Sequence, residues 1–256
     1  MLDSIFLDCD GVVTDRKARV DSRVMFEAFR LAHSGKKVAF VTGRSLDWLS
    51  RNVVPAIERL NPSQEEKARF FFVGECGNRW LSFTSQGLAH GSDDSHTVPE
   101  RIRSEVRQDI WRYPYLFFDE SKESFISLEV EHQKVTSAQA DRDAGRQLDE
   151  ARDFFAAKYP DLNAIRTLYA VDITMPGVGK GAAARRALEL MGRVSQALIV
   201  GDSPIDLEMG DELMGRGIAF EFYFVGEMAP QRSPFPVKRA PAFYAEGTLE
   251  VLRNVR

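Results

Sequence analysis

Two aspartates separated by a single residue follow the first apolar segment of the chain. The sequence Asp8-Cys9-Asp10-Gly11 comes directly after residues 4–7, and side chains two apart on an extended strand lie on the same side. Paired carboxylates at the carboxyl edge of a parallel sheet can hold a hard divalent cation and divide the roles of nucleophile and general acid/base. A simple Asp-Gly turn that closes a strand explains the same residues, so this motif alone leaves both interpretations open.

A second pair of acids, Asp202 and Asp206, follows the apolar residues 197–201. Two carboxylates four apart at a junction between loop and helix can share a metal ion with the first pair. Ser203, Pro204 and Asp206 also fit the N-cap, N1 and N3 positions of a capping box. Capping accounts for Asp206 without any function, but it does not account for Asp202.

A hydroxyl and a glycine end another apolar segment at Thr42-Gly43-Arg44, directly before a predicted helix. A hydroxyl group, a backbone amide and the positive end of a helix dipole together suit a phosphoryl group. The motif is weak by itself, because many strands end in Thr-Gly.

The glycine-rich residues 177–182 allow a different class of function. They do not form a Walker A loop, because no Ser or Thr follows Lys180, but they fit the pattern G-x-G-x-x-A. With Asp202 as the acid that binds a ribose, this pattern would indicate a dinucleotide-binding oxidoreductase. That alternative leaves Thr42 and both aspartates of the first motif unexplained.

The elements that must position these residues alternate between strand and helix. Apolar segments and caps predict strands at residues 4–8, 37–42 and 70–73, and helices at residues 22–34 and 45–57, the second with Ser45 as its N-cap. This order predicts a parallel sheet with right-handed crossover connections.

The pattern changes after residue 77. Residues 78–174 predict a hairpin, helices at 100–111 and 138–158, and strands at 115–118, 125–130 and 169–173. Residues 181–214 then return to helix, strand and helix. We therefore expect a doubly wound α/β core formed by residues 1–77 and 175–256, interrupted by an inserted α/β domain at 78–174. A response-regulator-like receiver, which also gathers carboxylates around magnesium, has no place for such an insertion.

Composition and charge exclude several classes of protein. The 34 basic and 38 acidic residues give a net charge of −4, which provides no basic field for gripping nucleic acid. Apolar runs such as residues 197–200 are too short to span a membrane, and the N-terminus lacks the pattern of a secretory signal. Only two cysteines are present, so we expect a reducing cytoplasm rather than a disulfide framework.

Taken in order, the four motifs resemble those of the haloacid dehalogenase-like phosphohydrolase superfamily. Asp8–Val12 is similar to its D-x-D-G-V/T motif, and Thr42 ends the second-motif strand. Lys180 stands at the start of a helix as in the third motif, and residues 201–206 match G-D-x-x-x-D. The family's core is a Rossmann-like doubly wound sheet, so the resemblance implies the same fold class as the pattern of elements.

The insertion between the second and third motifs resembles the type IIB cap. That branch includes Cof-like sugar phosphatases and the sucrose-, trehalose- and mannosyl-3-phosphoglycerate phosphatases. Ile205 replaces an asparagine common before the final acid, and Glu75-Cys76-Gly77-Asn78 replaces the usual Asn-Gly-Ala. Both departures bear on the substrate rather than on the chemistry.

The resemblance implies a Mg²⁺-dependent phosphatase in which Asp8 becomes an aspartyl-phosphate. Asp10 protonates the leaving alcohol and then activates water. Asp8, the carbonyl of Asp10 and Asp202 are implied ligands of Mg²⁺, and Asp206 orients the lysine or a water on the metal.

The resemblance also assigns the groups around the substrate phosphate. Thr42, the Gly43 amide and Lys180 clamp the phosphoryl group, and Ser203 belongs to the same phosphate-binding set. Arg44 either reaches a second anionic group of the substrate or pairs with an acid of the core. The expected partner is a small phosphorylated metabolite, a sugar phosphate or a glycosyl-phosphoglycerate. A sugar phosphomutase and a homodimer both remain open.

Overall fold

The structure, a computed structural model, describes residues 2–15, 18–228, 230 and 232–255 and divides into two compact units. The first unit comprises Met1–Ser92 and Gly179–Arg256, and the second comprises Asp93–Val178. The outer ends of the predicted core, residues 1 and 256, lie outside the described residues. Both predicted inner boundaries move, the first from 77 to 92 and the second from 174 to 178.

The first unit is built on an eight-stranded sheet in the order β12-β11-β10-β1-β2-β3-β4-β5. Its strands are β12 (Val237–Arg239), β11 (Ala219–Phe224), β10 (Gln196–Gly201), β1 (Ser4–Leu7), β2 (Lys37–Val41), β3 (Phe70–Gly74), β4 (Arg79–Thr84) and β5 (Gly87–Ser92). All neighbouring strands from β12 to β3 are parallel, and β4 and β5 are antiparallel. The predicted α/β class with a mainly parallel sheet is confirmed.

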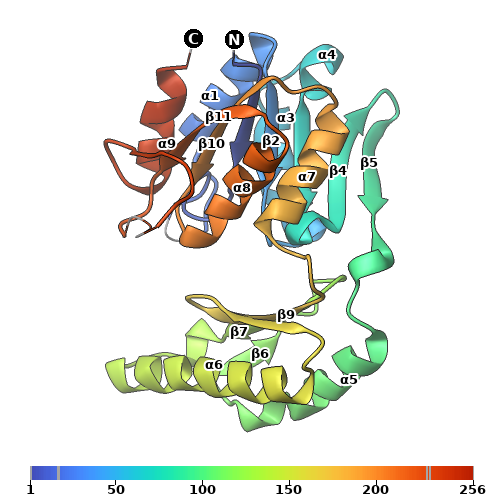
Figure 1. The fold of residues 1–256 in the computed structure, drawn as a ribbon, viewed down its shortest axis with the longest axis vertical. Helices are drawn as coiled ribbons and strands as arrows, with labels where there is room; N and C mark the ends of the chain where they lie inside the picture. Colours follow the sequence, from blue (N-terminus) through green and yellow to red (C-terminus); the bar gives the residue numbers. More distant parts are fainter. Residues whose placement is uncertain (1, 16–17, 229, 231, 256) are drawn as a thin grey trace. The chain divides into compact units, whose positions relative to one another are not determined.

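Helices cover both faces of this sheet (Figure 1). They are α1 (Ser22–His33), α2 (Leu46–Asn52), α3 (Val54–Glu58), α4 (Gln64–Lys67), α7 (Lys180–Met191), α8 (Leu207–Gly215) and α9 (Tyr244–Arg253). Successive residues of β1 alternate between the two sides: Ile5 packs into the core with α1 and α9, and Phe6 into the core with α7 and α8. The continuous apolar strands are therefore buried on both faces, as expected for a parallel sheet.

Two predicted elements differ from the structure for local reasons. The helix from Ser45 keeps its predicted cap, because the Trp48 amide donates to Ser45 Oγ at 3.3 Å. It then divides into α2 and α3, and Pro55 lies in the first turn of α3, where its missing amide costs no intrahelical hydrogen bond. The hairpin that begins the predicted insertion instead extends the core sheet, since β4 pairs with β3.

Contacts between aromatic rings fix that hairpin to the core. The Phe72 ring stacks on Phe40 with centroids 5.5 Å apart and meets Phe83 of β4 edge to face at 5.7 Å. Aromatic pairs of this geometry add stability beyond the area that they bury. The sequence pattern did not reveal this pairing, because it joins residues that belong to different predicted domains.

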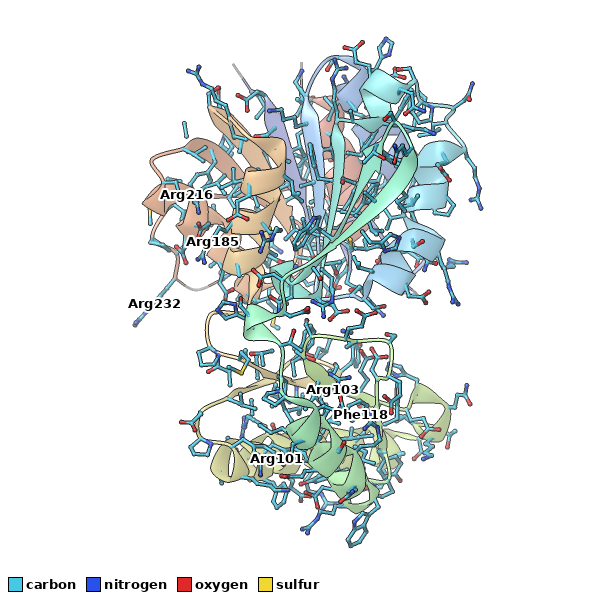
Figure 2. The ribbon with its side chains drawn as sticks, turned by 90° about the vertical axis from the view of Figure 1, so that its right-hand side faces the viewer. Arg101, Arg103, Phe118, Arg185, Arg216 and Arg232 are labelled. Carbon is cyan, nitrogen blue, oxygen red and sulfur yellow. The ribbon has the colours of Figure 1, made fainter. Side chains whose placement is uncertain are left out.

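The second unit is a four-stranded antiparallel sheet with two helices. Its strands, in the order β6-β7-β9-β8, are β6 (Leu116–Phe118), β7 (Ile126–Val130), β9 (Ala170–Thr174) and β8 (Asn163–Arg166), and its helices are α5 (Glu100–Asp109) and α6 (Ala138–Lys158). Arg103 of α5 lies beside Phe118 (Figure 2), and its guanidinium carbon is 5.4 Å from the ring centroid. The buried guanidinium also donates to the carbonyls of Lys122 and Phe125, both at 2.7 Å. These bonds anchor the loop between β6 and β7 to α5.

No helix in the described ranges combines the length and the apolar character needed to cross a bilayer.

Replacing Phe72 by alanine should destabilise the protein by about 3–5 kcal/mol, because it removes a buried ring that two other rings contact. Phe26→Ala on the exposed side of α1 should change the free energy of unfolding by less than about 1 kcal/mol. Urea unfolding of both variants measures the difference. Equal losses would contradict the assignment of Phe72 to the core.

Candidate active site

Three strands of the parallel sheet deliver their following residues to one edge. β1 lies between β10 and β2, with Leu7 level with Val200 and Phe40. Asp8, Thr42 and Asp202 follow these strands at their carboxyl ends. The chain proceeds from β1 to β2 on one side and reaches β10 on the other, so the sheet has a topological switch point here. Such points are the usual ligand sites of open α/β sheets.

A buried lysine links two of the predicted acids. Lys180 is the first residue of α7, and its Nζ donates to Asp8 Oδ1 and lies 2.8 Å from Asp206 Oδ1. The ammonium group also donates to the Val41 carbonyl at 3.3 Å. Burial disfavours the charged form of Lys180, but the carboxylates of Asp206 and Asp8 outweigh burial and raise the pKa of the ammonium. Lys180 is therefore a fixed positive charge beside Asp8.

Asp206 makes the capping contacts that its sequence position suggested, and it also faces the lysine. Its Oδ2 accepts from the Asp202 amide, the Ser203 amide and Ser203 Oγ, each at 3.0 Å. Its Oδ1 faces Lys180 Nζ. One carboxylate thus caps the turn after β10 and positions the lysine. The Ser203 hydroxyl lies on Asp206, and its contact with a substrate phosphate remains a prediction.

Asp8, Asp202 and Asp206 form a group that suits a divalent cation. Each offers a carboxylate oxygen, and these oxygens lie within 4.8 Å of one another. Burial raises the pKa of Asp8 well above its usual range, although Lys180 opposes the shift. Burial and then the charge of Asp206 raise the pKa of Asp202 to about 7. Three carboxylates beside a single ammonium leave uncompensated negative charge, and an all-oxygen set matches the ligands that hard cations prefer.

Gly11 makes room for this acidic group. A Cβ at residue 11 would lie 2.2 Å from Asp202 Oδ2, and its φ of +72° is in the left-handed region that glycine tolerates. The Asp10 side chain is not part of the carboxylate group found among the described residues. The implied metal contact of Asp10 through its carbonyl remains a prediction.

The loop after β2 holds the residues assigned to the phosphoryl group. Thr42 is buried, and its Oγ1 accepts from the Arg44 amide at 3.1 Å. The Arg44 side chain donates from Nε to Asp10 Oδ2 and from Nη2 to Asp10 Oδ1, both at 2.9 Å. Of the two roles that the sequence left open for Arg44, the structure shows pairing with an acid, and that acid is Asp10.

A left-handed turn at residues 75–77 supports this loop. In the sequence these residues stand out only as a departure from the family pattern. Glu75, Cys76 and Gly77 have φ angles of +46°, +55° and +104°. The Cys76 amide donates to the Thr42 carbonyl at 3.1 Å, and the Glu75 amide donates to the Arg44 carbonyl at 2.9 Å. Positive φ at two non-glycine residues is costly and is commonly found at functional sites.

The same turn packs against the helix that carries Lys180. A Cβ at Gly77 would lie 2.9 Å from the Ala182 carbonyl of α7. The turn therefore connects the loop at residues 42–44 to α7, the helix that carries Lys180. Gly77 is the one residue of this turn whose type favours a positive φ. Glu75 and Cys76 disfavour that conformation, so their types gave no indication of the turn.

The arrangement around α7 argues against the dinucleotide alternative. The glycines precede α7 but follow β9, an antiparallel strand of the second unit. The Gly181 amide in the first turn of α7 donates to Glu208 Oε2 at 3.3 Å. A carboxylate therefore occupies the place where a dinucleotide pyrophosphate would bind at the helix N-terminus.

No family model matches the chain. It is 24% identical over 254 residues to a phosphoglycolate phosphatase of Methanothermobacter thermautotrophicus, covering 98% of this chain and 97% of that protein.

Solved structures with the same fold cover nearly the whole chain. A haloacid dehalogenase-like hydrolase from Bacteroides thetaiotaomicron matches with a TM-score of 0.70 at 12% identity, covering 100% of both chains. The C-terminal domain of a trehalose-6-phosphate phosphatase from C. albicans matches with a TM-score of 0.68 at 14% identity, covering 98% of this chain and 90% of that one. The chain therefore has the haloacid dehalogenase-like fold, as its four motifs predicted.

The raised pKa of Asp202 predicts that metal affinity depends on pH. Below pH 7 the metal-free protein holds a proton on Asp202 that a cation must displace, so affinity should weaken as the pH falls below 7. Calorimetric titration with Mg²⁺ or Mn²⁺ between pH 5.5 and 8.5 measures this. Asp202→Asn should bind weakly at every pH, and an unchanged affinity in that variant would remove Asp202 from the metal site.

Proposed function

We propose that this protein is a Mg²⁺-dependent phosphatase that hydrolyses a small phosphorylated metabolite through an aspartyl-phosphate. One observation carries the proposal: a buried carboxylate, Asp8, is fixed by Lys180 at the switch point of the sheet, with Asp202 and Asp206 beside it. Similarity to a phosphoglycolate phosphatase and the fold of a trehalose-6-phosphate phosphatase support this class of reaction.

Asp8 is the proposed nucleophile. Lys180 engages Oδ1, which leaves Oδ2 to attack phosphorus. The bond between Asp8 and phosphorus forms as the ester bond breaks, and water later hydrolyses the resulting acyl phosphate. This divides one difficult displacement into two easier ones. Burial keeps bulk water away from the carboxylate and strengthens its interaction with Lys180.

Asp10 is the proposed general acid and base. It gives a proton to the leaving ester oxygen and takes one from the water that attacks the acyl phosphate. Its position two residues after Asp8 keeps it next to the nucleophile, and its carboxylate is more exposed than that of Asp8. Thr42, the Gly43 amide and Lys180 hold the transferring phosphoryl group through their hydrogen-bond donors.

Asp8, the Asp10 carbonyl and Asp202 would hold Mg²⁺, with Asp206 orienting Lys180 from the other side. When bound, this ion neutralises the negative charge of the phosphoryl oxygens. The chain's own contribution is a rigid set of carboxylates whose mutual repulsion the ion relieves.

The proposed substrate is a sugar phosphate or a glycosyl-phosphoglycerate, and the proposed setting is the cytoplasm. The net charge of −4 supports a small metabolite over a nucleic acid. Phosphate release from a panel of phosphorylated sugars, glycerates and phosphoglycolate, with Mg²⁺ and with EDTA, tests the class. An isomerised sugar phosphate as product in place of inorganic phosphate would indicate the phosphomutase alternative.

Asp8→Asn should lower kcat by roughly a thousandfold or more while the protein stays folded, because an amide does not attack phosphorus. Rapid-quench labelling with a ³²P-labelled substrate should trap phosphate on Asp8 of the wild type and none on the variant.

Asp211→Asn on the exposed side of α8 is the matched control and should retain wild-type activity. Substantial turnover by Asp8→Asn would refute the covalent mechanism.

A further inference from the structure

The proposed general acid is held by an arginine through both of its carboxylate oxygens. Arg44 Nε and Nη2 donate to Asp10 Oδ2 and Oδ1 at 2.9 Å each, the two-pronged geometry that guanidinium and carboxylate groups favour. In this arrangement each oxygen of Asp10 already accepts a strong hydrogen bond. A leaving ester oxygen needs one of these same oxygens.

The backbone of Arg44 is fixed at both of its polar groups. Its amide donates to Thr42 Oγ1 at 3.1 Å, and its carbonyl accepts from the Glu75 amide in the left-handed turn. The guanidinium carbon also lies 5.3 Å from the centre of the Trp48 ring. These contacts fix the position of Arg44 in the loop that follows β2.

The Arg44–Asp10 pair differs from the Lys180–Asp8 pair in its exposure to solvent. The side chains of Arg44 and Asp10 are 32% and 47% exposed, against 9% and 8% for Lys180 and Asp8. An ion pair that is accessible to water contributes little net free energy, so another anion can replace its carboxylate. The buried pair cannot be exchanged in this way without leaving a charge unpaired in the interior.

We propose that Arg44 selects phosphate esters whose alcohol part carries a second anionic group, a carboxylate above all. The inference rests on the proposed phosphatase function. The substrate carboxylate takes the place of Asp10 on the guanidinium. The released Asp10 carboxylate then takes up a proton from solvent and transfers it to the leaving ester oxygen. An ester with a neutral alcohol part cannot exchange with Asp10, so its leaving group meets an acid that is still paired with Arg44.

Three phosphate esters separate the steps of this proposal. Phosphoglycolate carries the second anion, and 2-hydroxyethyl phosphate differs from it by a neutral CH₂OH in place of the carboxylate. The phenolate of p-nitrophenyl phosphate leaves without protonation, so its hydrolysis reports on Asp8 and Lys180 without requiring Asp10 as an acid. The wild type should favour phosphoglycolate over 2-hydroxyethyl phosphate by roughly 10- to 100-fold in kcat/KM.

Arg44→Ala should remove the preference for phosphoglycolate over 2-hydroxyethyl phosphate. Its kcat/KM for phosphoglycolate should fall by roughly 10- to 100-fold, a loss much larger than any change in the hydrolysis of 2-hydroxyethyl phosphate or p-nitrophenyl phosphate. Arg44→Lys keeps the charge without the planar fork and should retain part of the preference, which also tests the proposal if the alanine variant folds poorly. Arg51→Ala, which alters an exposed arginine of α2 paired with Asp47, should behave as the wild type.

An equal loss on all three esters in Arg44→Ala would make Arg44 a structural residue and overturn the selection. A wild type that hydrolyses phosphoglycolate and 2-hydroxyethyl phosphate equally well would overturn it too, with the phosphatase function intact. Absence of hydrolysis of every ester would overturn the proposed function, and the inference with it.

Discussion

The buried contact of Lys180 with Asp8 and Asp206 is the interaction on which the site depends. Burying an ammonium and two carboxylates is unfavourable unless each is paired, and removing one partner would leave an uncompensated charge in the interior. The start of α7 and the ends of β1 and β10 are therefore held together by charge as well as by apolar packing. Asp202 adds a third carboxylate nearby, so three acidic side chains share one ammonium group.

This charge arrangement explains why the surrounding backbone is so closely fixed. The turn at Glu75, Cys76 and Gly77 bonds to the carbonyls of Thr42 and Arg44 and packs against α7. A shift of either the loop at residues 42–44 or α7 would disturb these contacts together. The cost of left-handed backbone at Glu75 and Cys76 is offset by the packing and hydrogen bonds of the turn, and what it secures is the relative position of Thr42 and Lys180.

The two acids of the first motif lie in different surroundings although only one residue separates them. Asp8 is buried and bonded to Lys180, whereas Asp10 is more exposed and bonded to Arg44. Cys9 between them is buried, which places it in the core and agrees with a packing role. This difference suits the proposed mechanism, in which the first step needs a positioned attacking oxygen on Asp8 and the second step needs access for water beside Asp10.

The sequence by itself determined the fold class and the four motifs, because strand ends, caps and apolar runs depend on neighbouring residues. It also predicted that Asp8, Asp202 and Asp206 lie together, since parallel strands bring their carboxyl ends to one edge. Only the tertiary structure placed the hairpin at residues 79–92 in the core sheet, because the edge-to-face contact of Phe72 with Phe83 is invisible to local pattern. It alone decided that Arg44 pairs with Asp10, and that one oxygen of Asp206 caps a turn while the other faces Lys180. Long side chains reach partners far along the chain, and the packed backbone decides which partner is in reach.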